Sequence, residues 1–299
     1  TAFVSPEEGL KFVGEDRGEL DMLFHFEVCD EMPAWDMLRF KHIQRRWYKG
    51  LWGKGANSQF LNNHDHTRQV TRFGNDGTYR KGSAKLLATM LHTLPGIPYV
   101  YQGEEIGMTG VRFDSIGQYD DIAMKNRYEE EVGKGGDPQQ VLRQLQPLSR
   151  DNSRTPMQWD DSLHAGFTAG TPWIRVNPNY KEINVKRDLA DPDSVYRYYR
   201  QLIRLRKEHD VMVFGDFEEL PEWIDDKRLY VYTRTLGEVQ WLIVLNHSAD
   251  SLSLGLPERY RGSSMKVLLA NYPAEETHSL DRVELRMRPW EARIYEILS

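Results

Sequence analysis

The chain has 299 residues, of which 39% are hydrophobic and 28% are charged, as expected for a globular protein with one large and one smaller domain. Its net charge of −6 argues against nucleic acid as a partner, because phosphate binding requires a basic surface. The sequence contains no run of about 18 apolar residues, so no membrane span is predicted. The single cysteine, Cys29, cannot form an internal disulfide, which favours a reducing, cytoplasmic location.

Three short apolar segments are predicted to be buried strands, at residues 21–27, 58–65 and 96–108. Helical spacing of apolar residues lies between them, around residues 35–47 and again at 84–94, where Pro-Gly ends the second helix. Because strands and helices alternate, we expect βαβ units and a parallel sheet.

After residue 108 the sequence pattern changes, first to a segment rich in turn residues and later to short β-branched runs. Residues 109–192 are rich in Gly, Pro, Asn and Asp and are predicted to be a long connection, which is unusual without a functional role. An amphipathic helix is predicted at 194–209. From about residue 215, short β-branched runs separated by turn residues predict a separate antiparallel β domain at 215–299, after a first domain at 1–214. The predicted strands are 229–235, 241–246, 265–269 and 293–298.

Polar and acidic residues follow each of the first three predicted strands, as in a (β/α)8 barrel, where the active site lies at the carboxyl ends of the strands. Glu27 ends the first strand, the run FLNNHDHTR at 60–68 ends the second, and Glu104 and Glu105 follow the third. A single His-Asp pair is usually structural, whereas the whole run at a strand end is more specific. Structural partners explain the three glutamates as well as a function does.

Several long motifs carry a family resemblance. They are FLNNHD at 60–65, RFGNDGTYR at 72–80, YVYQGEEIGMT at 99–109, RDNSRTPMQWDD at 150–161, HAGFT at 164–168 and NPNYKEINV at 177–185. Together they resemble the oligo-1,6-glucosidase and α-glucosidase branch of the α-amylase superfamily of glycoside hydrolases. The resemblance implies that the three strands are about the sixth to eighth of a (β/α)8 TIM barrel, and that a β-sandwich domain follows.

The same resemblance implies which catalytic groups this chain lacks. Family members carry an aspartate nucleophile after the fourth strand and a glutamate acid/base after the fifth, and both would precede Thr1. We therefore expect a C-terminal portion whose partner is the N-terminal half of the same barrel. The complete enzyme would act on small oligosaccharides by double displacement between two carboxylates. The resemblance implies no cofactor in this chain and a structural calcium, in some relatives, in the N-terminal half.

Four residues are candidates for the site by analogy with the family. Asp65 matches the third carboxylate, which stabilises the transition state, and His64 would donate to the same sugar hydroxyls. Arg154 matches an arginine that closes the pocket over the non-reducing end through a salt bridge to the N-terminal half. Arg68 is a weaker candidate for substrate binding, with a structural role favoured. A structural ion pair is also the alternative for Arg154.

The leading hypothesis is an exo-acting α-glucosidase that cleaves short α-glucosides, with α-1,6-linked sugars as the first expectation. Trehalose-6-phosphate hydrolase and sucrose isomerase are the alternatives, and the absence of arginine from residues 28–36 argues against the isomerase. A non-catalytic amylase-like heavy chain is less favoured, since Asp65 and His64 are present. His66-Thr67 replaces the usual Gln-Pro, and Ala123 stands where relatives often carry glutamate.

Overall fold

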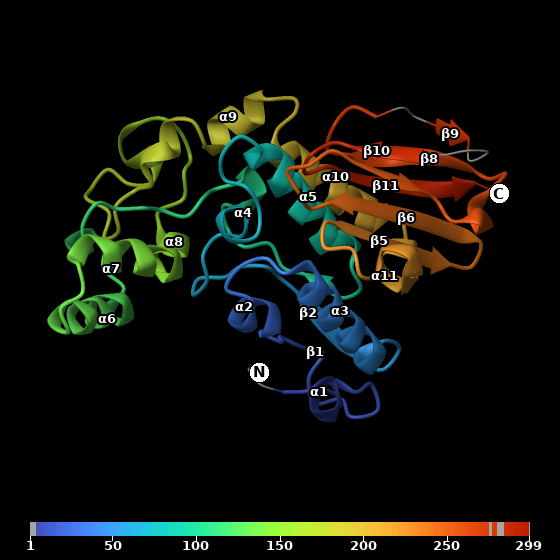
Figure 1. Cartoon of the computed structure of the whole chain (residues 1–299), viewed down its shortest axis with the longest axis horizontal. Helices are drawn as coiled ribbons and strands as arrows, with labels where there is room; N and C mark the ends of the chain where they lie inside the picture. The colour runs from blue at the N-terminus through green and yellow to red at the C-terminus, as the bar shows by residue number, and fades with distance from the viewer. Residues whose placement is uncertain (1–3, 275–276, 280–283, 299) are drawn as a thin grey trace. The chain divides into compact units, whose positions relative to one another are not determined.

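The computed structural model describes residues 4–274, 277–279 and 284–298 (Figure 1). The chain forms two compact units, the first from the described parts of 1–60, 81–99 and 198–299, and the second from 61–80 and 100–197. A three-stranded parallel sheet opens the first unit, in the order β1 (Met22–Leu23), β2 (Ala56–Gln59), β3 (Ile97–Pro98). This confirms the predicted parallel sheet.

The three strands are much shorter than predicted, because polar turns replace the sheet soon after it begins. Glu27 does not end a strand but starts helix α2 (Glu27–Glu31). After β2 the chain turns through Asn63, whose backbone bridges that of His66. After β3 it turns at Gly103, which has a φ of 90° and precedes the 3-10 turn η1 (Glu104–Ile106).

Local sequence signals define the helices of the first unit. Ser5 and Glu8 form a reciprocal cap at the start of α1 (Pro6–Val13). Asp36 accepts a hydrogen bond from the Arg39 amide at 3.0 Å, so α3 (Met37–Leu51) begins after the predicted Trp35. The other helices wholly or mainly in this unit are α5 (Arg80–Thr93), α10 (Val195–Glu208) and α11 (Val211–Phe214), which confirm the helices predicted at 84–94 and 194–209.

The C-terminal part of the first unit is antiparallel, as predicted. Its six-stranded sheet has the order β4-β5-β6-β11-β8-β9, and β10 pairs with β7 in a second sheet. The strands are β4 (Asp216–Glu219), β5 (Leu229–Leu236), β6 (Val239–Asn246), β7 (Leu252–Gly255), β8 (Ser264–Ala270), β9 (Thr277–Ser279), β10 (Glu284–Met287) and β11 (Ala292–Leu298). The four strands predicted from the sequence correspond to β5, β6, β8 and β11, and the shorter β4, β7, β9 and β10 were not predicted.

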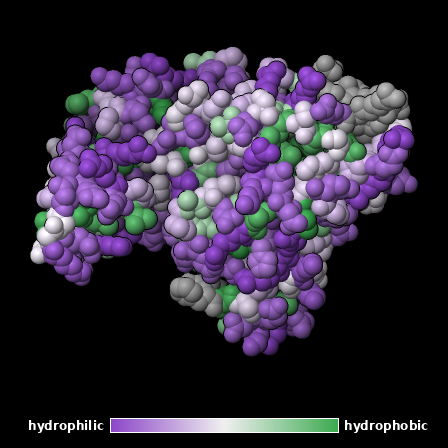
Figure 2. Space-filling model, in the orientation of Figure 1, coloured by the Kyte–Doolittle hydropathy of each residue, from purple (hydrophilic) through white to green (hydrophobic). Residues whose placement is uncertain are grey.

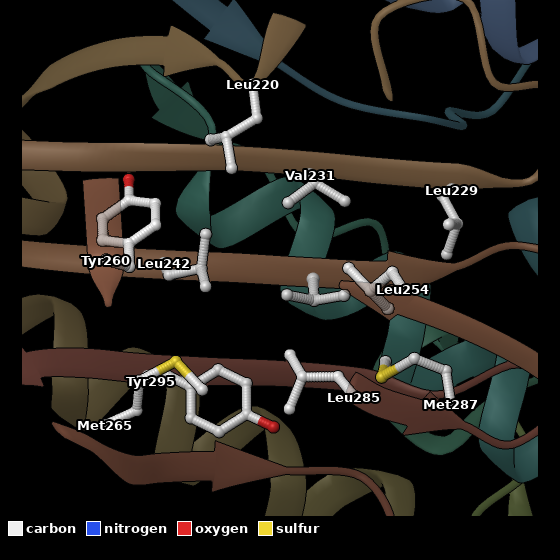
Figure 3. Close-up of a cluster of buried hydrophobic side chains, with 11 residues drawn as sticks. Leu220, Leu229, Val231, Leu242, Leu254, Tyr260, Met265, Leu285, Met287 and Tyr295 are labelled. Atoms are coloured by element: carbon white, nitrogen blue, oxygen red, sulfur yellow. The ribbon is translucent and has the colours of Figure 1, made fainter. Parts of the chain in front are cut away.

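A hydrophobic core lies between these two sheets (Figure 3). Val231 and Leu242 contribute from the large sheet, and Leu254 and Leu285 contribute from the small one. Each such side chain stabilises the fold by about 1.5–3 kcal/mol when fully buried. Two inner faces that share one core form a sandwich, as the resemblance implies.

The second unit corrects the prediction of an irregular connection at 109–192. Its helices are α4 (Gln69–Arg72), α6 (Ile122–Gly133), α7 (Pro138–Leu145), α8 (Asp151–Arg154) and α9 (Val185–Ala190). Val111, Phe113, Tyr119, Met124 and Leu142 form part of its own core. The apolar residues of this core are scattered over about thirty positions and several short elements, so no single periodic stretch announces them.

No helix in the described part of the chain is both long and apolar enough to cross a membrane. On the face drawn in Figure 2, hydrophilic residues predominate and hydrophobic residues are scattered among them.

Candidate functional site

The loop that follows β2 presents His64 and Asp65 to solvent. Asn63 Oδ1 accepts hydrogen bonds from the Asp65 amide at 2.8 Å and pairs with the His66 ring Nδ1 at 2.9 Å. This Asn-centred turn fixes the backbone, and the side chains of His64 and Asp65 remain 70% and 44% exposed. The loop therefore offers a carboxylate and an imidazole that a ligand can reach.

Asp65 is held from two sides. Arg154 Nη2 donates to Asp65 Oδ1 at 2.6 Å, and His64 Nε2 lies 3.2 Å from Asp65 Oδ2. Arg154 also donates through Nε to the His64 carbonyl at 2.8 Å. The Arg154 guanidinium therefore bonds to both the Asp65 carboxylate and the adjacent backbone, which limits the rotamers that Asp65 can adopt.

The structure places three of the four candidate residues together, and it pairs Arg154 within the chain. The resemblance predicts a salt bridge from Arg154 to the N-terminal half, whereas here the guanidinium pairs with Asp65. Arg154 ends the short helix α8, which is itself anchored at several points. Ser153 Oγ donates to the His66 carbonyl, and Asn152 Oδ1 accepts from the Val111 amide at 2.8 Å.

Unlike His64 and Asp65, Arg68 is buried, and only 1% of it is exposed. Its Nη1 donates to the Gln102 carbonyl at 2.8 Å, and its Nη2 donates to the Ser153 carbonyl at 3.3 Å. Burial lowers the pKa of its guanidinium to about 10, so the group stays charged at neutral pH. The burial argues against direct substrate binding by Arg68 and favours the structural role.

Tyr101 and Gly103 complete the surroundings of Arg68. The Tyr101 hydroxyl donates to the same Ser153 carbonyl at 3.0 Å, and the Tyr101 ring lies 5.8 Å from the guanidinium carbon. A Cβ at Gly103 would clash with Met108 Sδ and lie 2.7 Å from Arg68 Nη1, so a side chain there would displace the neighbouring side chains. Sequence reasoning singled out neither Tyr101 nor Ser153, although both lie in motifs that carry the family resemblance.

The three glutamates at the ends of the predicted strands have structural surroundings. Glu27 accepts a hydrogen bond from Trp47 Nε1 at 3.2 Å and pairs with Arg46. Glu105 accepts from the Gly103 amide at 2.7 Å, and burial raises the pKa of its carboxyl group. Glu104 is 2% exposed. None of the three offers a free carboxylate surface comparable to that of Asp65.

In the described ranges, no group of three or more His, Cys, Asp or Glu side chains is arranged to hold a metal ion. The site brings together an oriented carboxylate, an arginine and an imidazole. Such a group accepts hydrogen bonds from neutral hydroxyls and stabilises nearby positive charge.

Two known protein families match this chain, one over each of two consecutive ranges. The family described as "Alpha amylase, catalytic domain" matches residues 4–215, and "Maltogenic Amylase, C-terminal domain" matches 223–294. An oligo-1,6-glucosidase from Parageobacillus thermoglucosidasius is 50% identical over 99% of this chain and 54% of the relative.

Solved structures agree with the sequence comparisons. The trehalose-6-phosphate hydrolase of Bacillus licheniformis is 37% identical, with a TM-score of 0.91 over 99% of this chain and 55% of that one. An isomaltulose synthase from Erwinia rhapontici NX5 is 36% identical, with a TM-score of 0.89 over 99% of this chain and 54% of that one. The chain spans about half the length of the curated relatives that it matches.

Proposed function

This chain belongs to the family of alpha-amylase catalytic domains, and on that premise we propose that it forms part of a retaining, exo-acting α-glucosidase. The enzyme would release glucose from the non-reducing ends of short α-glucosides, with α-1,6 linkages preferred. The 50% identity to an oligo-1,6-glucosidase supports this assignment over the 38% identity to a trehalose-6-phosphate hydrolase from Bacillus subtilis.

The observation that carries the proposal is the exposed Asp65 carboxylate, which Arg154 and His64 hold in one orientation. In a retaining glycosidase one carboxylate attacks the anomeric carbon while a carboxylic acid protonates the departing oxygen. Water then cleaves the glycosyl-enzyme, and the second carboxyl group takes the proton from that water. We assign the nucleophile and the acid/base to the N-terminal half of the barrel, outside this chain.

Asp65 would act on the sugar rather than on the scissile bond. As the ring flattens toward an oxocarbenium ion, its hydroxyls become better donors, and hydrogen bonds to a fixed carboxylate strengthen. Because the gain comes mainly in the transition state, it raises kcat rather than ground-state affinity. His64 would donate to the same hydroxyls.

Arg68 would serve this site as a positioning residue. Its two carbonyl contacts, to Gln102 and Ser153, join the loop after β3 to helix α8, and α8 carries Arg154. A guanidinium that bridges two carbonyls through separate nitrogens holds them at a set distance, which lysine cannot reproduce. Arg68 would thus act on the sugar only through Arg154 and Asp65.

We propose three further properties of the complete enzyme. They are a cytoplasmic location, an oligosaccharide substrate and a boundary between domains near residues 214 and 215. Trehalose-6-phosphate hydrolase stays the second candidate, because a solved structure with that activity has a TM-score of 0.91 to this chain.

The test is the substitution Asp65→Asn in the complete enzyme, assayed on isomaltose, maltose and trehalose 6-phosphate. We expect kcat on isomaltose to fall by about two orders of magnitude or more, with a small change in KM. Asp161→Asn is the matched control, since Asp161 is also half-exposed and pairs with Lys186 at 3.0 Å. A kcat within a few-fold of the unsubstituted enzyme would contradict the role of Asp65. Exclusive turnover of trehalose 6-phosphate would favour the second candidate.

A further inference from the structure

A cavity of about 690 Å³ lies in the first unit, beside the parallel sheet. Its lining includes Asp21, which precedes β1, Ala56, which begins β2, and Ile97, which begins β3. The cavity is therefore at the amino ends of the strands, whereas the active site of a (β/α)8 barrel lies at their carboxyl ends.

The walls of the cavity are largely aromatic and aliphatic. Trp47, Tyr48 and Leu51 line it from α3, Phe214 from α11 and Phe217 from β4. Its rim carries large apolar side chains that are open to solvent. Leu20 is 54% exposed, Ile97 is 39% exposed and Phe214 is 62% exposed. An apolar rim of this kind marks a surface that another polypeptide or ligand covers.

Two polar residues of the lining, Arg206 and Gln59, are bonded within the first unit, and the charged Glu15, Asp21 and Lys54 also line the cavity. Arg206 donates to the carbonyls of His92 at 3.0 Å and Gly96 at 2.6 Å, and burial lowers the pKa of its guanidinium. Gln59 Nε2 donates to Gln44 Oε1 at 2.8 Å and to the Pro95 carbonyl at 2.8 Å. Because most of its walls are aromatic or aliphatic, the cavity suits a mainly apolar occupant.

The strand pairing indicates where that occupant comes from. Among the described residues β3 pairs only with β2, so its other edge is open. A barrel closes by pairing that edge with a further parallel strand. Parallel neighbours run in the same direction, so the added strand would begin beside Ile97, and the residues just before it would reach the cavity.

We propose that this cavity is the docking site for an apolar segment that immediately precedes the strand pairing with the open edge of β3. The segment belongs to the N-terminal half of the barrel, because this chain covers only 54% of its Parageobacillus relative. The inference rests on the proposed function for the existence of that half. It adds that the half is held by an apolar insertion at the amino ends of the strands, as well as by strand pairing.

Site-directed photocrosslinking tests the docking site. The folded chain, with Phe214→Cys, is labelled with a benzophenone maleimide and then mixed with the N-terminal part of the Parageobacillus relative that this chain does not cover. Cys29 is 2% exposed and is protected from the reagent. Leu20→Cys provides a second rim position. Val239→Cys is the control, because Val239 is 41% exposed on β6 and does not line the cavity.

Peptide mapping of the crosslinks decides the matter. We expect both rim positions to crosslink to residues just before the first barrel strand of the added polypeptide, and the control position not to. A Phe214→Glu chain should also bind that polypeptide at least about tenfold more weakly than Val239→Glu, since an unpaired carboxylate resists burial. Crosslinks that map elsewhere, or equal affinities of the two Glu variants, would overturn the docking site.

Activity of the same mixtures separates this inference from the proposed function. Hydrolysis of isomaltose without rim crosslinks would overturn the docking site and leave the function standing. Rim crosslinks to the expected segment without hydrolysis of any α-glucoside would support the docking site and contradict the function. Failure of the two polypeptides to associate would count against the docking site.

Discussion

Replacing Arg154 by lysine keeps a positive charge beside Asp65 but removes the planar fork. Arg154 now makes two separate bonds, from Nη2 to Asp65 at 2.6 Å and from Nε to the His64 carbonyl at 2.8 Å. A lysine ammonium is a single point donor on a flexible stem, so it can satisfy one of these acceptors but does not tie them together. The substitution therefore releases the Asp65 carboxylate without removing it.

The expected fall in kcat can be estimated from the additional χ1 rotamers that Asp65 can adopt. An unrestrained side chain samples roughly three staggered χ1 wells, which alone lowers the productive population about threefold. A displacement near 1 Å at a catalytic group can cost up to about 100-fold. We expect kcat of the complete enzyme to fall by about 10- to 100-fold, with KM changed by less than about threefold.

Stability should respond much less than activity. The side chains of Arg154 and Asp65 are 26% and 44% exposed, so solvent screens their ion pair. Such pairs contribute about 0–1 kcal/mol to the free energy of unfolding. The melting temperature should consequently change by only a few degrees.

Steady-state kinetics on isomaltose and maltose, with thermal unfolding of the same proteins, would check this prediction. Arg150→Lys is the matched control, since Arg150 directly precedes α8 and its guanidinium pairs with Asp121 at 2.9 Å. In a double-mutant cycle, the loss caused by Arg154→Lys should largely disappear in an Asp65→Asn background.

Two results would refute the reasoning. An unchanged kcat with a parallel rise in KM on both sugars would show that Arg154 serves ground-state binding of the terminal glucose and not the orientation of Asp65. Full additivity with Asp65→Asn would show that the arginine does not act through the carboxylate.

Three further predictions concern the chain and its stability. Residues 1–299 alone should hydrolyse no aryl α-glucoside, because the proposed nucleophile and acid lie outside them; turnover by a homogeneous preparation would contradict this. Burial lowers the pKa of His25 to about 3 and that of His92 to about 4, so the folded state resists protonation while the unfolded state accepts it below about pH 6.5. The free energy of unfolding of the complete enzyme should therefore fall as pH decreases from 7, by about 2 kcal/mol per histidine at pH 5, and urea titrations of His25→Gln should show a shallower fall. Lys41→Met should destabilise the protein by about 2–4 kcal/mol, since the buried Lys41 ammonium donates to the carbonyls of Trp223 and Asp226 at 2.7 and 2.8 Å; an unchanged urea midpoint would contradict that.

Much of the local structure could be predicted from neighbouring residues alone. The amphipathic spacing around Tyr198 and Leu202 predicted α10, and the β-branched runs predicted β5 and β6, because both patterns depend on positions a few residues apart. The run around His64 and Asp65 could be recognised as a candidate site because its motif is contiguous.

The partners of these residues depended on contacts between distant parts of the chain. Arg154 meets Asp65 across 89 positions, and the sequence around Arg154 carries no sign of which carboxylate it will find. Arg68 is anchored by carbonyls of Gln102 and Ser153, and since every residue has a carbonyl, no residue type announces such an acceptor. Folding alone buried Arg68 and left Asp65 exposed, because burial depends on which elements pack over a side chain and not on its own chemistry.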